Sequence, residues 1–212
     1  LDPACGSGAF PMGILHKLVF ILGKLDPGNS LWKAKQVDKA NEIPDSTIRE
    51  KVMEDIEQAF ERNELDYGRK LFLIENCIYG VDIQPIAVQI AKLRFFISLV
   101  VDQKMDDSLE NRGILPLPNL ETKFVAANSL IGVEGPKQKK LPNLEVRSAI
   151  EQKERELTDV RRSYFIARTL KTKTKWRERD ALLRAEISRL LEKEDFPPET
   201  TQKLAYLDPY DQ

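Results

Sequence analysis

The sequence has little of what metal centres, disulfide frameworks and membrane spans require. It contains one histidine, His16, and two cysteines, Cys5 and Cys77, among its 212 residues. A structural zinc site takes four Cys or His ligands and a disulfide framework pairs several cysteines, so neither is predicted. No apolar run approaches the roughly 20 residues that cross a bilayer, and no secretory signal pattern is present. These absences predict a protein of a reducing cytoplasm without a metal centre.

The sequence also lacks an excess of charge of either sign. Lys and Arg together number 33, Asp and Glu together number 34, and the formal net charge is −1. A nucleic-acid-binding protein that relies on its overall charge is strongly basic. Any contact with DNA must therefore come from a local basic patch. The length is sufficient for one domain with a core and an appendage.

A glycine turn between a strand end and a helix opens the chain. Residues 1–10 read LDPACGSGAF. Gly6 and Gly8 can adopt a positive φ and let the backbone approach a ligand closely. The amides of such a turn, together with a helix N-terminus, favour a carboxylate or phosphate, and Asp2 favours a cationic group. Glycines at such turns equally serve packing. No Lys-Ser/Thr pair follows them, which disfavours a phosphate-binding P-loop.

A second strand, acid and helix pattern lies at residues 77–100. The run CIYGVDI predicts a strand that ends near Asp82, and Pro85 suits the first position of a helix. In nucleotide-binding βαβ units this acid accepts hydrogen bonds from both ribose hydroxyls and follows the glycine turn by about 20 residues. Here it lies much further on, so residues 26–76 are predicted to be a helical insertion. A plain turn role for Asp82 is the alternative. The apolar side chains that mark one face of the following helix are Ile86, Ile90, Leu93, Ile97 and Val100.

The second half of the chain predicts one further strand and a charged helical hairpin. Residues 123–127 favour a parallel strand that ends at Asn128 and Ser129. Residues 144–196 favour two antiparallel helices or one kinked helix, with a basic middle that projects as a tip and contacts DNA phosphates. A solvated charged face is the alternative. The cations proposed for phosphate contact are Arg161, Arg162, Arg168, Lys171, Lys173 and Lys175.

The string Asp-Pro-Ala-Cys-Gly-Ser-Gly-Ala-Phe at residues 2–10 resembles the S-adenosylmethionine-binding motif of DNA adenine-N6 methyltransferases. Residues 78–94 are similar to the large methyltransferases of type IIG restriction–modification and BREX phage-defence systems. The resemblance implies an α/β fold, namely a partial Rossmann-like S-adenosylmethionine-dependent methyltransferase fold with helical insertions and a long helical hairpin. It also implies a bacterial or archaeal cytoplasmic enzyme that acts on double-stranded DNA.

The resemblance further implies roles for single residues. The turn wraps the methionine part of the cofactor with Asp2 near its amino group, Asp82 binds the ribose, and Ile83 packs on the adenine. Related enzymes usually carry Asp where this chain has Asn128, whose amide oxygen can still accept from the adenine amino group. The cofactor-binding set is then Asp2, Pro3, Ala4, Cys5, Gly6, Ser7, Gly8, Phe10, Asp82, Ile83, Asn128 and Ser129.

The catalytic Asn-Pro-Pro-Tyr-type loop of adenine methyltransferases is absent from the sequence. Residues 207–210, LDPY, lack the second proline and are predicted to form a surface turn. Because a strand is already ending at Leu1, we expect a piece of a larger protein. Its expected parts are a cofactor-binding core at 1–143, the hairpin at 144–196, and a segment at 197–212 that leads towards a missing catalytic strand. We expect no catalytic residue in the chain and no methyl transfer by the chain alone.

Three other functions stay open at this point. A nicotinamide-dependent dehydrogenase would need a Gly-x-Gly-x-x-Gly pattern, and no third glycine follows Gly8 at the required place. A non-catalytic helical interaction module would explain the missing loop. Methylation of RNA or protein fits the same motifs, because cofactor motifs do not read the substrate.

Overall fold

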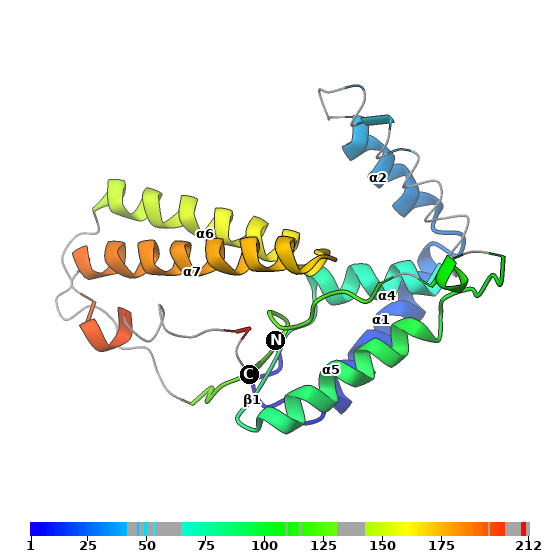
Figure 1. Ribbon diagram of the computed structural model, residues 1–212, viewed down its shortest axis with the longest axis horizontal. Coiled ribbons are helices and arrows are strands. Elements are labelled where there is room, and N and C mark those ends of the chain that lie inside the picture. The colour runs from blue at the N-terminus through cyan, green and yellow to red at the C-terminus, as the bar shows by residue number, and fades with distance from the viewer. Residues whose placement is uncertain are drawn as a thin grey trace. The chain divides into compact units, whose positions relative to one another are not determined.

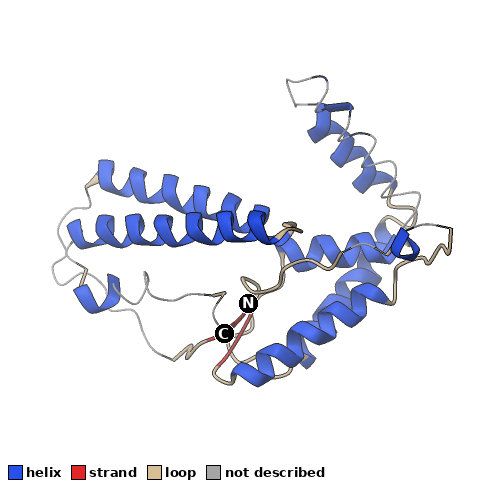
Figure 2. Cartoon of the chain, viewed as in Figure 1, coloured by secondary structure: helices blue, strands red, loops and turns tan. Residues whose placement is uncertain are grey.

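The computed structural model describes residues 1–41, 46, 49–50, 53, 65–108, 110–114, 116–130, 143–194, 196–201 and 209–210. Figure 1 shows the course of the chain, and Figure 2 shows that helices dominate the described residues. The chain divides into two compact units. The first comprises Leu1–Gly80 with Gln89–Leu117, and the second comprises Val81–Val88 with Pro118–Gln212. Among the described helices, none combines the length and the apolar character that a membrane span needs.

Helices make up the first unit. α1 (Ala9–Leu25) packs against α4 (Leu65–Asn76), and α2 (Ser30–Asn41) and most of α5 (Pro85–Val100) belong to the same unit, as does the short 3₁₀ helix η1 (Glu110–Gly113). α2 and α4 lie within the predicted insertion, most of whose remaining residues fall outside the described ranges. The buried side chains of this unit recur at helical spacing and include Leu15, Val19, Leu73, Ile74, Ala91, Phe95 and Leu99.

The structure buries a different face of α5 from the one that the sequence marks. Ala91, Phe95 and Leu99 are fully buried at four-residue spacing, whereas Ile90, Leu93 and Ile97 are exposed. The helix carries apolar side chains on both sides, so periodicity alone does not identify the buried face. The small side chain of Ala91 admits the closest approach of a neighbouring element, which explains why its face is the inner one.

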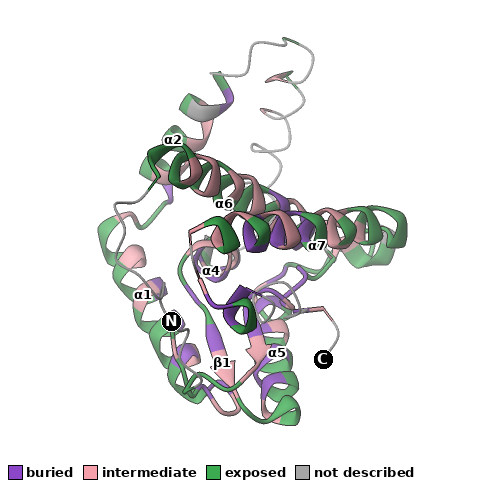
Figure 3. Ribbon diagram, turned by 90° about the vertical axis from the view of Figure 1, so that its left-hand side faces the viewer, coloured by how far each residue is buried: buried purple, intermediate pink, exposed green. Residues whose placement is uncertain are grey.

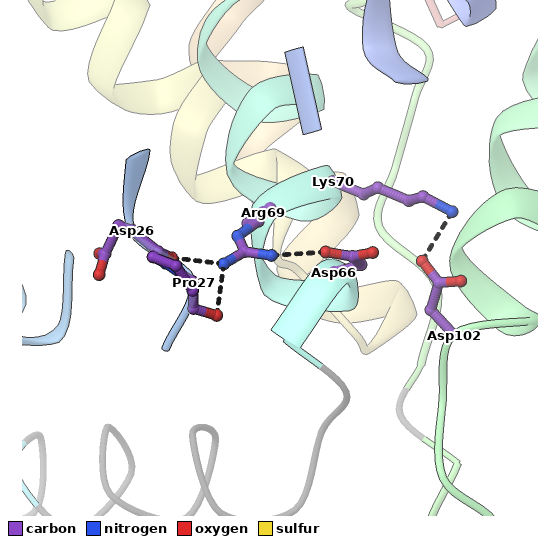
Figure 4. Close-up of polar contacts among 6 residues, drawn as sticks. All are labelled: Asp26, Pro27, Asp66, Arg69, Lys70 and Asp102. Atoms are coloured by element: carbon purple, nitrogen blue, oxygen red, sulfur yellow. Dashed lines mark hydrogen bonds and ion pairs between the residues drawn. The ribbon is translucent and has the colours of Figure 1, made fainter. Parts of the chain in front are cut away.

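Arg69 ties three segments of the first unit together (Figure 4). Its Nη2 donates to the carbonyl oxygens of Asp26 at 2.6 Å and Pro27 at 3.0 Å, and its Nη1 contacts Asp66 Oδ1 at 2.7 Å. At the next residue, Lys70 Nζ lies 2.6 Å from Asp102 Oδ2. These partly buried polar contacts fix α4 to the end of α1 and to the segment that follows α5.

The second unit contains a small parallel sheet. β1 (Gly80–Asp82) begins at the boundary between the units and pairs with β2 (Phe124–Ala126). Both strands have three residues, so β1 is shorter than the strand predicted over residues 77–83. Two strands do not make the multi-stranded sheet of a Rossmann-like fold, and that part of the fold class stays a prediction. Asp82, which the sequence singles out, is the last residue of β1, and Asn128 comes two residues after β2.

α6 (Leu144–Phe165) and α7 (Leu170–Lys193) form the predicted hairpin as two separate helices that lie side by side (Figure 1). Their buried side chains gather between the helices, and their outer faces are exposed (Figure 3). Asp180 is fully buried in this seam. Its Oδ1 accepts from Arg161 Nε at 2.8 Å and its Oδ2 from Arg184 Nε at 2.6 Å. The hairpin core is therefore polar as well as apolar.

The turn between α6 and α7 is docked on the residues that precede β2. Asn119 Nδ2 donates to the carbonyl oxygens of Tyr164 at 2.8 Å and Ala167 at 2.7 Å, and Asn119 N donates to Phe165 O at 2.9 Å. The turn in the basic middle of the hairpin is therefore held by hydrogen bonds to another segment of its own unit, and its contact with DNA phosphates stays a prediction. A single buried asparagine thus adds hydrogen bonds to carbonyl groups at the end of α6 and in the turn that follows it.

The described part of the LDPY segment is not a surface turn. Pro209 is buried, and the Tyr210 ring lies 4.7 Å from the Tyr164 ring and 5.2 Å from the Arg177 guanidinium carbon. Burial, with the nearby carboxylate of Asp180, raises the pKa of the Tyr210 hydroxyl. An aromatic partner on the hairpin overrides the exposed location that turn residues predict. Leu207 and Asp208 lie outside the described residues.

Candidate functional site

The glycine turn predicted at the start of the chain is formed, and it begins beside β1. Asp2 makes a parallel bridge with Gly80, and its N–H donates to Tyr79 O at 2.8 Å. The Asp2 carboxylate then accepts from Ala4 N at 3.1 Å, which turns the chain away from the strand direction. The pairing with Gly80 is a part of the site that sequence reasoning missed, because strand pairing leaves no local signal.

Buried Cys5 anchors the middle of the turn. Its carbonyl oxygen accepts from Gly8 N at 2.9 Å, and α1 starts at the next residue, Ala9. Pro3, Ala4 and Phe10 are exposed around this anchor, and Ser7 is half-buried. Phe10 is 69% exposed, although it is one of the largest apolar side chains in the unit. The turn thus presents backbone and apolar surface to the outside.

The two glycines of the turn serve different purposes. Both have positive φ, +52° at Gly6 and +81° at Gly8. A Cβ on Gly8 would lie 2.9 Å from Ala91 Cβ and 3.1 Å from Ala91 Cα, whereas a Cβ on Gly6 would meet nothing within 4 Å. Gly8 therefore allows the start of α1 to pack on α5. Gly6 keeps an open space beside the backbone, which is the place that a ligand would use.

Alanine substitutions should separate these two roles. We expect Gly8→Ala to lower the free energy of unfolding by about 2–4 kcal/mol, because it adds a steric clash to an unfavourable φ. Gly6→Ala should cost only about 1–2 kcal/mol, because only the backbone conformation is unfavourable. Urea denaturation followed by circular dichroism measures both. Gly13→Ala is the control, since this helical glycine has open space around it. Equal losses for Gly6→Ala and Gly8→Ala would contradict the assignment.

The ends of β1 and β2 lie next to each other in the second unit. Ala127 N donates to Asp82 O at 2.8 Å, so the side chains that follow the two strands start from neighbouring positions. Asp82 Oδ1 accepts from Gln84 N at 2.9 Å, and Asn128 Oδ1 accepts from Leu130 N at 3.0 Å. Both side chains thus make the same local turn bond. This bond accounts for a polar residue at each strand end and leaves further acceptor capacity on each side chain.

Apolar and polar side chains are both accessible at this edge. Ile83 is 66% exposed, Asn128 and Ser129 are exposed, and Asp82 is half-buried. The structure thus brings Asp82, Ile83, Asn128 and Ser129 to one edge of the small sheet. The glycine turn belongs to the first compact unit and this edge to the second. Carboxylate and amide acceptors next to an exposed aliphatic side chain are suited to a ligand with hydroxyl or amino groups and a flat ring.

Residues 76–203, more than half of the chain, match the family model of the Eco57I restriction-modification methylases. The chain belongs to this family. The chain is also 46% identical over 72 residues to a protein of Methanocaldococcus jannaschii that is provisionally named a type II restriction enzyme and methyltransferase. That match covers 34% of the chain and 6% of the relative. No solved structure matches the chain significantly. The predicted membership of a restriction–modification methyltransferase family is confirmed.

Several cations of the hairpin are engaged inside the hairpin itself. Arg161 contacts buried Asp180, Arg177 donates to the Tyr164 hydroxyl at 2.9 Å, and Arg179 contacts Glu156. The contact with Arg179 lowers the pKa of the Glu156 carboxyl, although burial acts in the opposite direction. Arg161 is therefore committed to the hairpin core. The cations that lie on the exposed or half-exposed surface near the turn are Arg162, Arg168, Lys171, Lys173 and Lys175.

A possible metal site and the role of Asn119 complete the description of the site. Within the described ranges, no group of three or more His, Cys, Asp or Glu side chains is arranged to hold a metal ion. Asn119 is a positioning residue that sequence reasoning missed. The only available signal is an asparagine ahead of a strand, and that signal does not distinguish a clamp from an ordinary turn.

Proposed function

We propose that this chain is the cofactor-binding part of a methyltransferase that transfers a methyl group from S-adenosylmethionine to adenine N6 in double-stranded DNA. The family match over residues 76–203 carries the proposal. The biological setting is then a restriction–modification or phage-defence system in the cytoplasm of a bacterium or archaeon. The predicted division into a cofactor core at 1–143, a hairpin at 144–196 and a C-terminal segment at 197–212 belongs to the same proposal.

The glycine turn supports binding of the methionine part of S-adenosylmethionine. The Asp2 carboxylate has the charge to attract the ammonium group, and its geometry leaves an oxygen besides the one that Ala4 N contacts. The open space at Gly6 admits a ligand against the backbone. Gly8 at the N-cap of α1 has no side chain to accept from the first N–H groups of the helix. These N–H groups therefore favour a carboxylate of the ligand. These residues fit a zwitterionic amino acid.

The edge formed by β1 and β2 supports binding of the adenosine part. Asp82 has the acceptors for two ribose hydroxyls, and exposed Ile83 offers an apolar surface to the adenine ring. Asn128 uses one lone pair of its amide oxygen for Leu130 N and keeps another for the adenine amino group. When bound, S-adenosylmethionine supplies a methyl group that its sulfonium makes electrophilic. Asp2, Asp82 and Asn128 would hold and orient this cofactor.

DNA is the proposed substrate, and its phosphates are the proposed partners of the hairpin cations. Arg168, Lys171 and Lys175 are exposed, whereas Arg161 is paired with buried Asp180. The Lys175 ammonium also lies 4.8 Å from the centre of the Trp176 ring. Phosphate contacts of this type dominate the affinity of proteins for DNA. Arg161, which the sequence places in the same set, is removed from it because it neutralises a buried carboxylate.

Methylation assays test the proposal. The full-length protein that contains this chain is incubated with labelled S-adenosylmethionine and duplex DNA, and the modified base is identified by mass spectrometry. We expect N6-methyladenine. The 212-residue chain should transfer no methyl group, because its sequence holds no Asn-Pro-Pro-Tyr-type loop to accept the protons of the target amino group. Label in cytosine, in RNA or in protein, or transfer by the isolated chain, would overturn the corresponding part of the proposal.

A further inference from the structure

The turn between α6 and α7 exposes two aliphatic side chains that phosphate contacts do not explain. Ile166 is 65% exposed and Leu170 is 80% exposed, and Arg168 lies between them in the chain. We propose that Ile166 and Leu170 form an apolar wedge that contacts the bases of duplex DNA, while the surrounding cations hold its phosphates. The inference rests on duplex DNA being the substrate in the proposed function.

The charge around the turn complements a polyanion. Between Asp159 and Glu178 the sequence contains no acidic residue, although the whole chain has a net charge of −1. Arg161 and Arg177 are engaged inside the hairpin, and the other cations in this stretch are Arg162, Arg168, Lys171, Lys173 and Lys175. Such a local excess attracts DNA even when the rest of the molecule is neutral or acidic. A protein partner with scattered charges would not require an uninterrupted run of one sign.

The first turns of the two hairpin helices carry side chains of opposite charge. The first turn of α6 carries Glu145, which suits the positive end of the helix dipole. The first turn of α7 carries no acid and instead contains Lys171 and Lys173, whose charges oppose that end of the dipole. The lysines at the start of α7 therefore do not stabilise the helix that carries them. An anion bound beside them would remove this repulsion.

The turn is held rigidly before any ligand arrives. Thr169 and Thr172 form a reciprocal capping box, in which Thr172 N donates to Thr169 Oγ1 at 3.2 Å. Asn119 holds the other side of the turn through the carbonyl oxygens of Tyr164 and Ala167. Rigid presentation lowers the entropic cost of binding. DNA-binding proteins insert Ile or Leu side chains between base steps next to Arg and Lys contacts, which is the combination found at this turn.

Titration of the 212-residue chain with a fluorescent DNA duplex at several salt concentrations tests the inference. We expect Leu170→Ala and Ile166→Ala to weaken binding about 10-fold without changing the salt dependence, because they remove no charge. Lys171→Gln should lower the slope of log K against log salt by about one unit. A 2-aminopurine base in the duplex should gain fluorescence on binding as it unstacks, and Leu170→Ala should remove that gain.

The chain offers matched controls for both kinds of variant. Leu144 is the first residue of α6 as Leu170 is of α7, and it is 79% exposed at the other end of the hairpin. Leu144→Ala should bind DNA like the parent chain. Lys193→Gln, at the far end of α7, should leave the salt slope unchanged. Circular dichroism melting curves confirm that the exposed positions tolerate alanine.

Three outcomes would overturn the inference. They are an absence of duplex binding at low salt, equal effects of Leu170→Ala and Leu144→Ala, and tighter binding of single-stranded RNA or polyglutamate than of duplex DNA. These titrations contain no S-adenosylmethionine, so they are independent of methyl transfer. If the protein methylates adenine but the wedge variants bind DNA like the parent chain, the proposed function holds and the inference is wrong. A confirmed wedge in a protein that methylates cytosine would leave only the inference standing.

Discussion

Replacing Asp82 by alanine should weaken the binding of S-adenosylmethionine on the order of 100-fold. In the proposed site the carboxylate accepts hydrogen bonds from two ribose hydroxyls, and a hydrogen bond to a charged group contributes about 1.5–3 kcal/mol. Asp82→Asn should lose about 10-fold, because the amide keeps an acceptor and the turn bond to Gln84 N but loses the charge. Isothermal titration calorimetry with S-adenosylmethionine measures both variants against the parent chain.

Asp106 provides the matched control for this experiment. Its Oδ1 accepts from Ser108 N at 2.9 Å, which is the same local turn bond as that of Asp82, and it lies outside the proposed cofactor residues. Asp106→Ala should leave cofactor affinity unchanged. If Asp82→Ala binds the cofactor as tightly as the parent chain, Asp82 has the plain turn role and the ribose assignment is wrong. If both alanine variants lose affinity equally, the effect comes from turn stability.

Removing the buried carboxylate of Asp180 should lower the free energy of unfolding by about 3–5 kcal/mol. Asp180 is fully buried between Arg161 and Arg184, and Arg184 is itself buried. Asp180→Ala leaves the Arg184 guanidinium buried without its carboxylate, and an uncompensated buried charge is the main cost of breaking such a pair. Urea denaturation of the chain, followed by circular dichroism at 222 nm, measures the loss.

A double variant separates the contribution of the pair from the cost of breaking it. Asp180→Leu combined with Arg184→Met removes both charges and keeps apolar volume, so it should recover most of the stability that Asp180→Ala loses. Glu178→Ala, an exposed position on the same helix, is the control and should leave the unfolding midpoint unchanged. A midpoint for Asp180→Ala equal to that of Glu178→Ala would show that solvent reaches the seam between α6 and α7.

Local patterns in the sequence predict the elements that depend on neighbouring residues. The first helix starts after Gly8 as its glycines and apolar spacing indicate, the helix at Pro85 begins at that residue, and the hairpin has two helices. Asp82 is the last residue of β1 and Asn128 comes two residues after β2, because a strand that ends in an acid or amide is a local pattern. These are features in which propensity, capping and periodicity agree with the fold.

Features that depend on residues distant in the sequence are not predicted by local sequence patterns. The exposed face of α5 looks like a core face, because Ile90, Leu93 and Ile97 recur at helical spacing, as do the buried Ala91, Phe95 and Leu99. The hairpin turn looks free until Asn119, more than 40 residues upstream, is seen to bind its carbonyl groups. Arg161 looks like a DNA contact until buried Asp180 is found beside it. In each case a tertiary partner decides the role.

In the proposed cofactor site, the contact between Gly8 and Ala91 would couple cofactor affinity to a residue outside the proposed cofactor-binding set. A Cβ at Gly8 would lie 2.9 Å from the Ala91 side chain, so the two positions together set how closely α1 approaches α5. The turn that precedes α1 moves with the helix. Any larger residue at position 91 would therefore act as a spacer that shifts the whole turn outwards. If the turn binds the methionine part of the cofactor as proposed, substitutions at position 91 would change its affinity while every residue of the turn stays the same.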